Sequence, residues 1–290
     1  MPPMDRPEPL ICHSLWGHDG DLDGAIARAR ALGFDGLEAN LDHGALTAHE
    51  PRVVADRLQQ EGLALIVEIV TGGDYVPALD SGPDRQLAEL DTGLQRCQGL
   101  RPLHITVISG SDAWPRQQQD RFLERAVALA EAATAPVSFE THRSRCLFNP
   151  WTMPELLERH PGLRLTADLS HWCCVSERLM EPELPPVQAM ADRVDHIHAR
   201  VGHAQGPSVA HPFAPEAAAA LAAHRRCWQL FLERQQARGH GRPTITPEFG
   251  PDGYLPTLPF TAMPVADLLG INGAMARWIR QGALSSISRA

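Results

Sequence analysis

The amino-acid sequence predicts an α/β protein, a single (β/α)₈ TIM barrel that occupies residues 1–290 as one domain. Eight short apolar segments alternate along the whole chain with about eight segments of helical periodicity. The length of 290 residues accommodates one such domain without remainder. An open doubly wound sheet is the alternative, but it lacks the support of a glycine-rich turn after the first apolar segment.

Four pairs of a strand and a helix are expected in the first half of the chain. Each expected strand is a short, largely apolar run, and each expected helix repeats apolar residues at helical spacing. The segment 63–70 is nearly continuously apolar, which is typical of a strand buried on both faces. The expected strands are 9–13, 37–38, 63–70 and 102–107, and the expected helices are 22–32, 51–60, 85–98 and 117–133.

The same alternation continues through the second half of the chain. The helix expected at 151–159 carries Pro154 in its first turn, where proline is tolerated. The helix at 215–236 is rich in alanine, whereas the helical pattern across 176–191 is poorly defined. The expected strands are 136–140, 163–168, 194–198 and 244–248, and the closing helix is 265–280.

The composition is that of an ordinary globular enzyme. Hydrophobic residues make up 43% of the chain and charged residues 21%, which argues against disorder. A net charge of −9 is opposite to the basic surface expected of a nucleic-acid-binding protein. No apolar run approaches the ~20 residues of a membrane span, and the N-terminus lacks the pattern of a secretory signal. We therefore expect a cytoplasmic protein without nucleic-acid or membrane partners.

Two features of residue usage exclude further kinds of site. All 26 basic residues are arginine, so the chain has no lysine for a Schiff base, for pyridoxal phosphate or for a P-loop. The six cysteines are scattered and form no CxxC pair. Neither a disulfide framework nor a zinc ribbon is expected, and the cysteines are interpreted as buried free thiols.

Four of the expected strands end on a residue that binds divalent metal ions well: Glu140, Asp168, His198 and Glu248. Their spacings of 28, 30 and 50 residues (168−140, 198−168 and 248−198) match one strand–helix unit each, the last with a longer loop or helix. Because the carboxyl ends of barrel strands point toward a shared axis, we expect these side chains to be neighbours. Three carboxylates and an imidazole favour Mn²⁺ or Mg²⁺, with Co²⁺, Fe²⁺ or Zn²⁺ as alternatives. His196 competes with His198, which is preferred because it lies nearer the strand end.

The segments around these four residues carry a resemblance to a known family. They are Phe139-Glu140-Thr141-His142, Ala167-Asp168-Leu169-Ser170-His171, His196-Ile197-His198-Ala199-Arg200 and Pro247-Glu248-Phe249-Gly250. They resemble the sugar phosphate isomerase/epimerase superfamily of xylose-isomerase-like barrels. Ketose 3-epimerases, hydroxypyruvate isomerases, inosose dehydratases and apurinic-site endonucleases belong to this group. One departure is that Arg200 and its neighbours stand where His-x-Lys-Asp is common in the family.

The resemblance implies roles for individual residues. The four strand-end residues would together hold one divalent ion, Mn²⁺ in the first place. His171 would contact a substrate oxygen, with help from Arg200. Four more histidines are candidates for substrate binding, each with an ordinary structural role as its alternative: His13, His104, His142 and His203.

Other polar and aromatic residues near the strand ends are expected at the barrel mouth. Trp16, Glu38 and Glu68 follow or end the first three strands. The pair Arg143 and Arg145 is a candidate for bidentate binding of a phosphate or carboxylate, with a solvated loop pair as its alternative.

The activity implied by the resemblance is proton transfer beside the carbonyl of a small sugar-like substrate, a free sugar, a sugar phosphate or an oxo acid. Glu140 and Glu248 would stand on opposite sides of the substrate, one removing a proton and the other returning it. This gives an epimerase or isomerase, and elimination of a β-hydroxyl would instead give a dehydratase. A non-catalytic sugar- or metal-binding barrel is the alternative of another class, and the acidic charge disfavours an apurinic-endonuclease-type phosphodiesterase. The family often forms dimers, so a homodimer is a candidate assembly.

Overall fold

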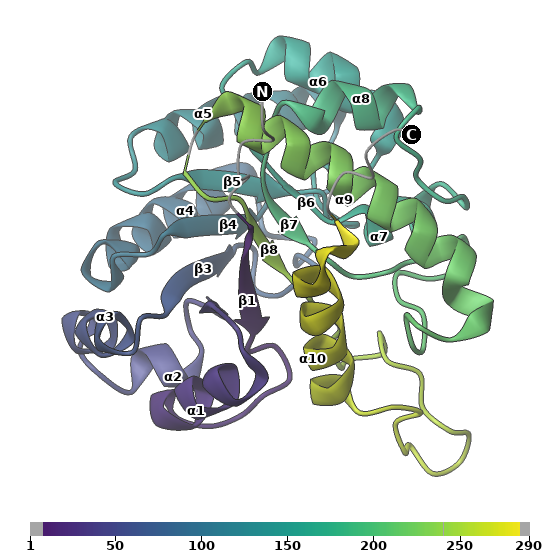
Figure 1. Cartoon of the computed structure of the whole chain (residues 1–290). Coiled ribbons are helices and arrows are strands. Elements are labelled where there is room, and N and C mark those ends of the chain that lie inside the picture. The colour runs from purple at the N-terminus through teal and green to yellow at the C-terminus, as the bar shows by residue number, and fades with distance from the viewer. Residues whose placement is uncertain (1–7, 240, 285–290) are drawn as a thin grey trace, which may run out of the picture.

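Eight parallel strands close into a barrel in the computed structural model, which describes residues 8–239 and 241–284. The strands pair in chain order, and β1 closes the ring by pairing with β8 (Figure 1). Their bounds are β1 Leu10–Ser14, β2 Gly36–Asn40, β3 Ala64–Val70, β4 His104–Ile108, β5 Val137–Glu140, β6 Leu165–Ala167, β7 Val194–His198 and β8 Thr244–Thr246. This topology confirms the predicted (β/α)₈ barrel and excludes the open doubly wound sheet.

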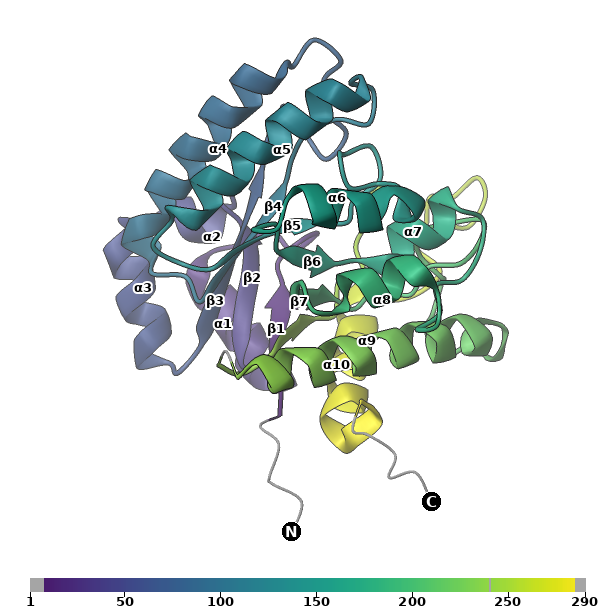
Figure 2. The ribbon, with the colours of Figure 1, turned by 90° about the horizontal axis from the view of Figure 1, so that it is seen from above.

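The helices lie outside the strands in both views of the ribbon (Figures 1 and 2). The α-helices are α1 Leu22–Leu32, α2 Gly44–Thr47, α3 Pro51–Gln60, α4 Pro83–Cys97, α5 Arg116–Glu131, α6 Met153–Arg159, α7 Leu169–Val175, α8 Pro185–Ala191, α9 Ala218–Arg238 and α10 Leu268–Trp278. Short 3₁₀ turns adjoin three of them at η1 Gln98–Leu100, η2 Pro150–Thr152 and η3 Pro215–Ala217, and a π-turn, η4 Ile279–Ala283, follows α10.

Two helices have the bounds that the sequence predicts because their end signals are strong. The helix α1 begins where the Asp21 side chain accepts a hydrogen bond from the amide of Gly24. It ends at Gly33, whose φ of 73° lies in the left-handed region that glycine adopts without strain. The helix α3 has Pro51 at its start, where the missing N–H costs no hydrogen bond.

The structure differs from the prediction at two strand ends and in one helix. The strand β8 ends at Thr246, because Pro247 has no N–H with which to continue the ladder, so Glu248 lies beyond the strand. Asp168 likewise follows β6 and caps the unpredicted helix α7 by accepting a hydrogen bond from the amide of Ser170. The poorly defined helix expected across 176–191 is only the shorter α8.

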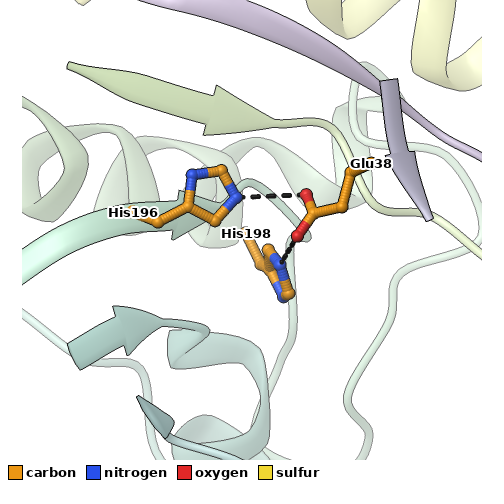
Figure 3. A group of neighbouring side chains, drawn as sticks. All are labelled: Glu38, His196 and His198. Carbon is orange, nitrogen blue, oxygen red and sulfur yellow. Dashed lines mark hydrogen bonds and ion pairs between the residues drawn. The ribbon is translucent and has the colours of Figure 1, made fainter. Parts of the chain in front are cut away.

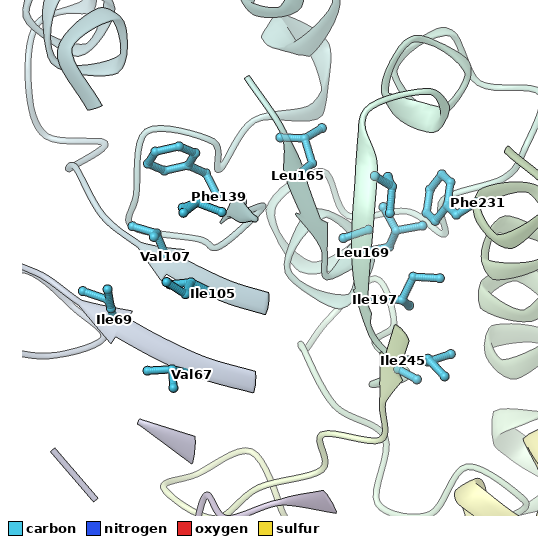
Figure 4. Close-up of a cluster of buried hydrophobic side chains, with 14 of the residues drawn as sticks. Val67, Ile69, Ile105, Val107, Phe139, Leu165, Leu169, Ile197, Phe231 and Ile245 are labelled. Carbon is cyan, nitrogen blue, oxygen red and sulfur yellow. The ribbon is translucent and has the colours of Figure 1, made fainter. Parts of the chain in front are cut away.

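The outward faces of the strands are apolar and pack against the helices. Figure 4 shows part of this layer, with aliphatic and aromatic side chains from the strands β3 to β8. The side chains labelled on these strands are Val67, Ile69, Ile105, Val107, Phe139, Leu165, Ile197 and Ile245. Because successive side chains of a strand point to opposite faces, the residues between them point into the barrel.

The barrel interior is filled by a hydrogen-bonded polar network instead of the usual branched apolar side chains. The hydroxyl of Ser138 lies 2.7 Å from Nε2 of His104 and 2.5 Å from the hydroxyl of Thr166. On the other side, His196 Nδ1 lies 2.8 Å from the hydroxyl of Thr244. Buried polar groups that are paired in this way rigidify the floor on which the strand-end residues stand.

Other sequence predictions have mixed outcomes. All six cysteines are free, and five of them are buried, as predicted. No helix in the described ranges is long and apolar enough to span a membrane. Most of the N-terminal segment, on which the absence of a secretory signal was argued, lies outside the described residues.

Candidate metal centre

The four residues predicted as metal ligands lie together at the carboxyl end of the barrel. Each offers one oxygen or nitrogen atom, and these atoms all lie within 4.8 Å of one another. Glu140 and His198 are the last residues of β5 and β7. Asp168 follows β6 directly, and Glu248 lies two residues beyond β8. All four side chains are buried, so the barrel brings four distant strand ends into one enclosed cluster.

Glu38 of β2 joins the two histidines of β7 from across the barrel (Figure 3). Its Oε1 lies 3.0 Å from Nε2 of His198, and its Oε2 lies 3.1 Å from Nε2 of His196. Burial alone would raise the pKa of Glu38, but the charges and hydrogen bonds of His198 and His196 hold that pKa well below its usual value. The ionised Glu38 therefore accepts the Nε2–H of His198 and fixes the orientation of that ring.

With Nε2 directed at Glu38, the other ring nitrogen of His198 faces the ligand set. This Nδ1 lies 3.1 Å from Glu248 Oε2 and 3.5 Å from Glu140 Oε2, yet it makes no hydrogen bond within the described residues. Glu140 Oε2 is also buried without a hydrogen-bond partner in that part of the chain. An unsatisfied buried polar atom costs about 1–3 kcal/mol. A divalent cation between these atoms would satisfy both, so the residues present fit a metal ion.

The same atoms bind protons when no cation is present. Burial raises the pKa of Glu140 to about 7; His198 acts to lower it, and Glu248 and Asp168 act to raise it. Burial acts to lower the pKa of His198, but Glu248, Glu38 and Glu140 raise it well above its usual value. A proton on Nδ1 of His198 and a metal ion are thus alternative occupants of one position, and binding of the ion must release protons.

Arg200 is the positive partner of this carboxylate-rich cluster. Its guanidinium is buried and pairs with Asp168, and Nη1 lies 3.4 Å from Glu248 Oε2. Burial acts to lower the pKa of Arg200, but Asp168 and Glu248 raise it above its ordinary value. The guanidinium also lies 4.5 Å from the ring centre of Tyr254 and 5.5 Å from that of Trp16, a cation–π arrangement.

His171 and His142 also lie at the cluster, as predicted. His171 Nε2 is 2.8 Å from Arg200 Nη2, which donates to it, and 3.5 Å from Glu140 Oε1. Burial, and then His142 and Arg200, lower the pKa of His171 well below its usual value, so this ring is neutral. The rings of His142 and His171 lie 4.0 Å apart, and Nδ1 of His142 is within hydrogen-bond reach of the carbonyl of Arg143.

Three other histidines predicted to bind substrate lie elsewhere. His13 pairs in register with Leu37 and faces the helix layer, where its ring stacks on Phe34 at 5.0 Å. The expected place of His13 at the mouth was wrong because Ser14 is the residue of β1 that lines the hollow there, and neighbouring residues of a strand point to opposite faces. His104 lies deeper in the barrel, in its polar floor. His203 lies in the 203–206 turn after β7, where its Nδ1 accepts a hydrogen bond from the amide of Gln205 and its backbone pairs with Gly206.

The predicted anion-binding pair Arg143 and Arg145 does not form. Arg145 is fully buried and is part of the scaffold, neither a phosphate ligand nor a solvated loop residue. Within the described residues, its guanidinium donates hydrogen bonds only to backbone carbonyl oxygens, those of Thr71, Asp74, Tyr75 and Gly110. Arg143 is half-buried, with its guanidinium 5.0 Å from the ring centre of Tyr254.

Two connected hollows adjoin the ligand set. The smaller has a volume of about 10 Å³ and is lined by Glu140 and Arg200, among others. The larger has a volume of about 130 Å³ and lies at the ends of β1, β2 and β3. Glu68 and Glu248 line both hollows, so the larger one opens directly beside the ligand set.

Both tyrosines of the chain lie at this site, and the prediction missed them. Tyr75 follows β3 and donates a hydrogen bond of 3.1 Å to Glu68 Oε1. Tyr254 follows β8, and its ring meets that of Trp16 edge-on at 5.0 Å. The rarity of tyrosine in this sequence, with both copies in loops after expected strands, was the available signal. Together with Trp16, the two tyrosines cover the ligand set.

Two further sets of three side chains overlap the four-residue set. One consists of Glu38, His196 and His198, and the other of Glu140, His142 and His171. In the first set, a proton on each histidine Nε2 explains the short contacts to Glu38 without a metal ion. The four-residue set remains the best candidate, because it offers the most ligand atoms and contains two unsatisfied ones.

Comparisons with known proteins agree with this architecture. A family model described as a xylose isomerase-like TIM barrel matches residues 26–213. The structure is similar to D-allulose 3-epimerase from Methylomonas sp. in complex with D-allulose, at 16% identity and a TM-score of 0.58, covering 95% of this chain and 97% of that one. It is also similar to the probable 3-DHS dehydratase AsbF from Bacillus anthracis, at 15% identity and a TM-score of 0.62, covering 93% and 98% of the two chains.

A third similar structure contains a metal ion. It is a xylose isomerase-like TIM barrel protein from Mycobacterium smegmatis in complex with magnesium, at 15% identity and a TM-score of 0.62, with 96% and 97% of the two chains covered. Likeness at such low identity shows a shared fold alone. No curated protein matches the sequence significantly.

Proposed function

The chain belongs to the xylose isomerase-like TIM barrel family, and we propose that it is a divalent-metal-dependent isomerase or epimerase of a sugar-like substrate. The observation that carries this proposal is the convergence of one ligand atom from each of the four strand ends within 4.8 Å. The oxygen-rich set favours Mn²⁺, with Mg²⁺, Co²⁺, Fe²⁺ or Zn²⁺ as alternatives. A divalent cation held there supplies Lewis-acid stabilisation beside a carbonyl group.

Glu140 and Glu248 are the proposed acid–base pair. Both line the smaller hollow beside the ligand set. A substrate bound there through the cation would expose a carbon next to its carbonyl group to the two carboxylates. One carboxylate removes the proton beside the carbonyl, and the other returns it. Return to the opposite face of the same carbon gives an epimer, and return to the neighbouring carbon gives an isomer.

Neighbouring residues are proposed to hold the substrate and exclude water. His171 and Arg200 are placed to bind a substrate oxygen, because both reach the edge of the ligand set. The aromatic rings of Trp16, Tyr75 and Tyr254 cover this space and keep water from the intermediate enediolate.

The test is proton exchange into deuterated water with added Mn²⁺ and a panel of ketoses, oxo acids and inososes. The wild-type protein should exchange one C–H proton of its substrate, and Glu140→Gln and Glu248→Gln should each slow this exchange by ~10²–10⁴-fold at saturating Mn²⁺. Glu158→Gln on the exposed surface of α6 is the control with the same chemical change. Exchange that survives either of the first two substitutions would overturn the acid–base assignment.

A dehydratase is the second candidate, and Glu68 favours it. Burial, then Glu248 and Glu140, raise the pKa of Glu68 to about 8, so this side chain is a carboxylic acid at neutral pH. Burial is the largest cause of this raised pKa, and it persists when a cation offsets the charges of Glu248 and Glu140. A neutral acid beside the substrate can protonate a departing hydroxyl group, and the likeness to a probable dehydratase supports the same chemistry. Loss of water from the substrate, followed by NMR, distinguishes this reaction from epimerisation.

Three alternatives and expectations remain open to experiment. A non-catalytic barrel would bind sugar or metal without exchanging any substrate proton. The cytoplasmic location and the lack of nucleic-acid and membrane partners remain predictions from the sequence. The homodimer is implied only by the resemblance and also remains a prediction.

A further inference from the structure

A molecule bound at the ligand set can extend from there into the larger hollow. Its volume is about 130 Å³, and it borders the ligand set at Glu248 and Glu68. A space of this size holds several water molecules, or the short hydroxylated chain that displaces them. The chemistry of its lining therefore indicates which end of a substrate it accepts.

The lining of the larger hollow offers no positive charge. No arginine lines it within the described residues, and the sequence contains no lysine. Both ring nitrogens of His43 are already used: Nδ1 accepts from the amide of Ala45, and Nε2 donates to the carbonyl of His18. Burial, and then the charge of Arg28, lower the pKa of the second lining histidine, His18. His43 therefore has no free N–H for an anionic ligand, and the positively charged form of His18 is disfavoured.

Acidic side chains, in contrast, line the larger hollow. Asp19 and Glu38 are the carboxylates of this lining that lie outside the ligand set, whereas Glu68 is a neutral acid and Glu248 belongs to the ligand set. The nearby positive charges are already matched, since the three carboxylates of the ligand set offset the divalent cation and Arg200 together. A phosphate or carboxylate in this hollow would meet like charges without a compensating cation.

Two buried polar groups face the hollow with unused hydrogen-bonding capacity. Glu68 is only 5% exposed; its Oε1 accepts from Asn40 at 3.3 Å and Tyr75 at 3.1 Å, while Oε2 has no partner within the described residues. The hydroxyl oxygen of Ser14 accepts from the amide of Trp16, and its hydrogen has no acceptor in that part of the chain. A ligand hydroxyl both donates and accepts, so it complements both groups.

From this lining we propose that the larger hollow is a subsite for the uncharged, hydroxylated end of the substrate, with Ser14 and Glu68 binding its hydroxyl groups. A substrate phosphorylated or carboxylated at that end is rejected. This assignment rests on the proposed function only in calling the ligand a substrate. The subsite itself can be tested with an unreactive polyol, because the binding of that polyol is measured without any reaction.

The experiment compares matched pairs of uncharged and charged ligands on the Mn²⁺-loaded full chain. Calorimetry measures the binding of C5 and C6 sugar alcohols and of their terminal phosphate monoesters, and deuterium exchange measures turnover of the corresponding ketoses and ketose phosphates. We expect the phosphates to bind at least about 100-fold more weakly than the alcohols, because a phosphate in the hollow meets like charges without a compensating cation. The exchange rates should show the same order.

The outcomes separate the subsite from the proposed reaction. Polyol binding with rejection of the phosphates, but without exchange of any ketose, supports the subsite and overturns the isomerase. Exchange that is faster for ketose phosphates than for free ketoses supports the isomerase and overturns the subsite. Failure of every polyol to bind also overturns the subsite.

A charge reversal at the rim tests the electrostatic cause directly. Asp19 is exposed where it lines the hollow, so Asp19→Lys adds a cation there with little risk to folding. It should reduce the discrimination against phosphates by about tenfold. Glu158→Lys makes the same change in net charge on the outer surface of α6 and should leave the discrimination unchanged. Equal effects of both variants would contradict the proposal.

Discussion

The two halves of the barrel mouth use carboxylates in different ways. In the half formed by β5 to β8, Glu140, Asp168 and Glu248 converge with His198 on one point and are closed in by Arg200. In the half formed by β1 to β3, Glu38 and Glu68 line the larger hollow and do not belong to the four-residue set. Glu38 accepts hydrogen bonds from two imidazoles, and Glu68 accepts from an amide and a phenol. The neighbours of a strand-end carboxylate, more than its position in the barrel, therefore determine what it can bind.

The largest expected effect is on stability, and it comes from removing Arg200 in the half of the mouth formed by β5 to β8. Arg200→Met leaves Asp168 and Glu248 buried without their positive partner, and breaking a buried pair costs about 3–5 kcal/mol. The free energy of unfolding of the metal-free protein should fall by about 3 kcal/mol. Saturating Mn²⁺ should restore part of this loss, because the cation supplies positive charge to the same carboxylates. Urea unfolding with and without Mn²⁺ measures both quantities.

Arg145→Met is the matched control for this prediction. Arg145 is equally buried, but it donates to backbone carbonyl oxygens and not to the ligand set. Its substitution should also destabilise the protein, without recovery on addition of Mn²⁺. If Mn²⁺ restores the same amount of stability in both variants, then Arg200 does not compensate the negative charge of Asp168 and Glu248.

The next effect concerns the one carboxylate that links the two halves. Glu38→Gln keeps the shape of the side chain but removes the charge that orients His198 and increases its basicity. Loss of such a partner typically weakens metal affinity by ~10–100-fold. Titration of Mn²⁺ followed by electron paramagnetic resonance measures the dissociation constant. Glu68→Gln, which has no histidine partner, should change affinity much less, and an unchanged affinity in Glu38→Gln would refute the orienting role.

At neutral pH, the smallest expected effect comes from the outward face of β1. Burial lowers the pKa of His13 from 6.5 to about 3, and both ring nitrogens lack partners within the described residues. Between these pH values the unfolded chain binds a proton that the folded chain does not, so stability falls as the pH falls through this window. His13→Leu should make this fall shallower by about 1 kcal/mol per pH unit.

Urea unfolding between pH 4 and pH 7 measures this slope, and exchange assays at neutral pH measure activity. Because His13 faces Phe34 and not the mouth, we expect Leu at this position to leave the exchange rate unchanged. A large loss of exchange in the His13→Leu variant would place this residue in the site after all.

The sequence revealed those parts of the site that depend on local pattern. The four ligand residues each terminate or follow an apolar segment at the period of a strand–helix unit, and that information lies within a few residues of each. His13 was misplaced because successive strand residues point to opposite faces, and Ser14 next to it takes the position that lines the mouth. His203 was misplaced because the 203–206 turn closes on itself after β7.

Contacts across the barrel were beyond the reach of the sequence. The hydrogen bond from His198 to Glu38 joins residues 160 positions apart, and no local pattern specifies that pairing. The burial of Arg145 beneath the 71–75 loop is of the same kind, because its carbonyl partners carry no side-chain signal. The roles of Tyr75 and Tyr254 depend on where two long loops fold, which the strand pattern does not determine.

The central claim is that one divalent ion binds where the four strand ends converge. Anomalous diffraction at the manganese absorption edge from crystals grown with Mn²⁺ tests it most directly. The account predicts a single peak within coordination distance of Glu140, Asp168, His198 and Glu248, next to Nδ1 of His198. A peak between Glu38 and His196 instead, or the absence of any peak at the four-residue set, would contradict it.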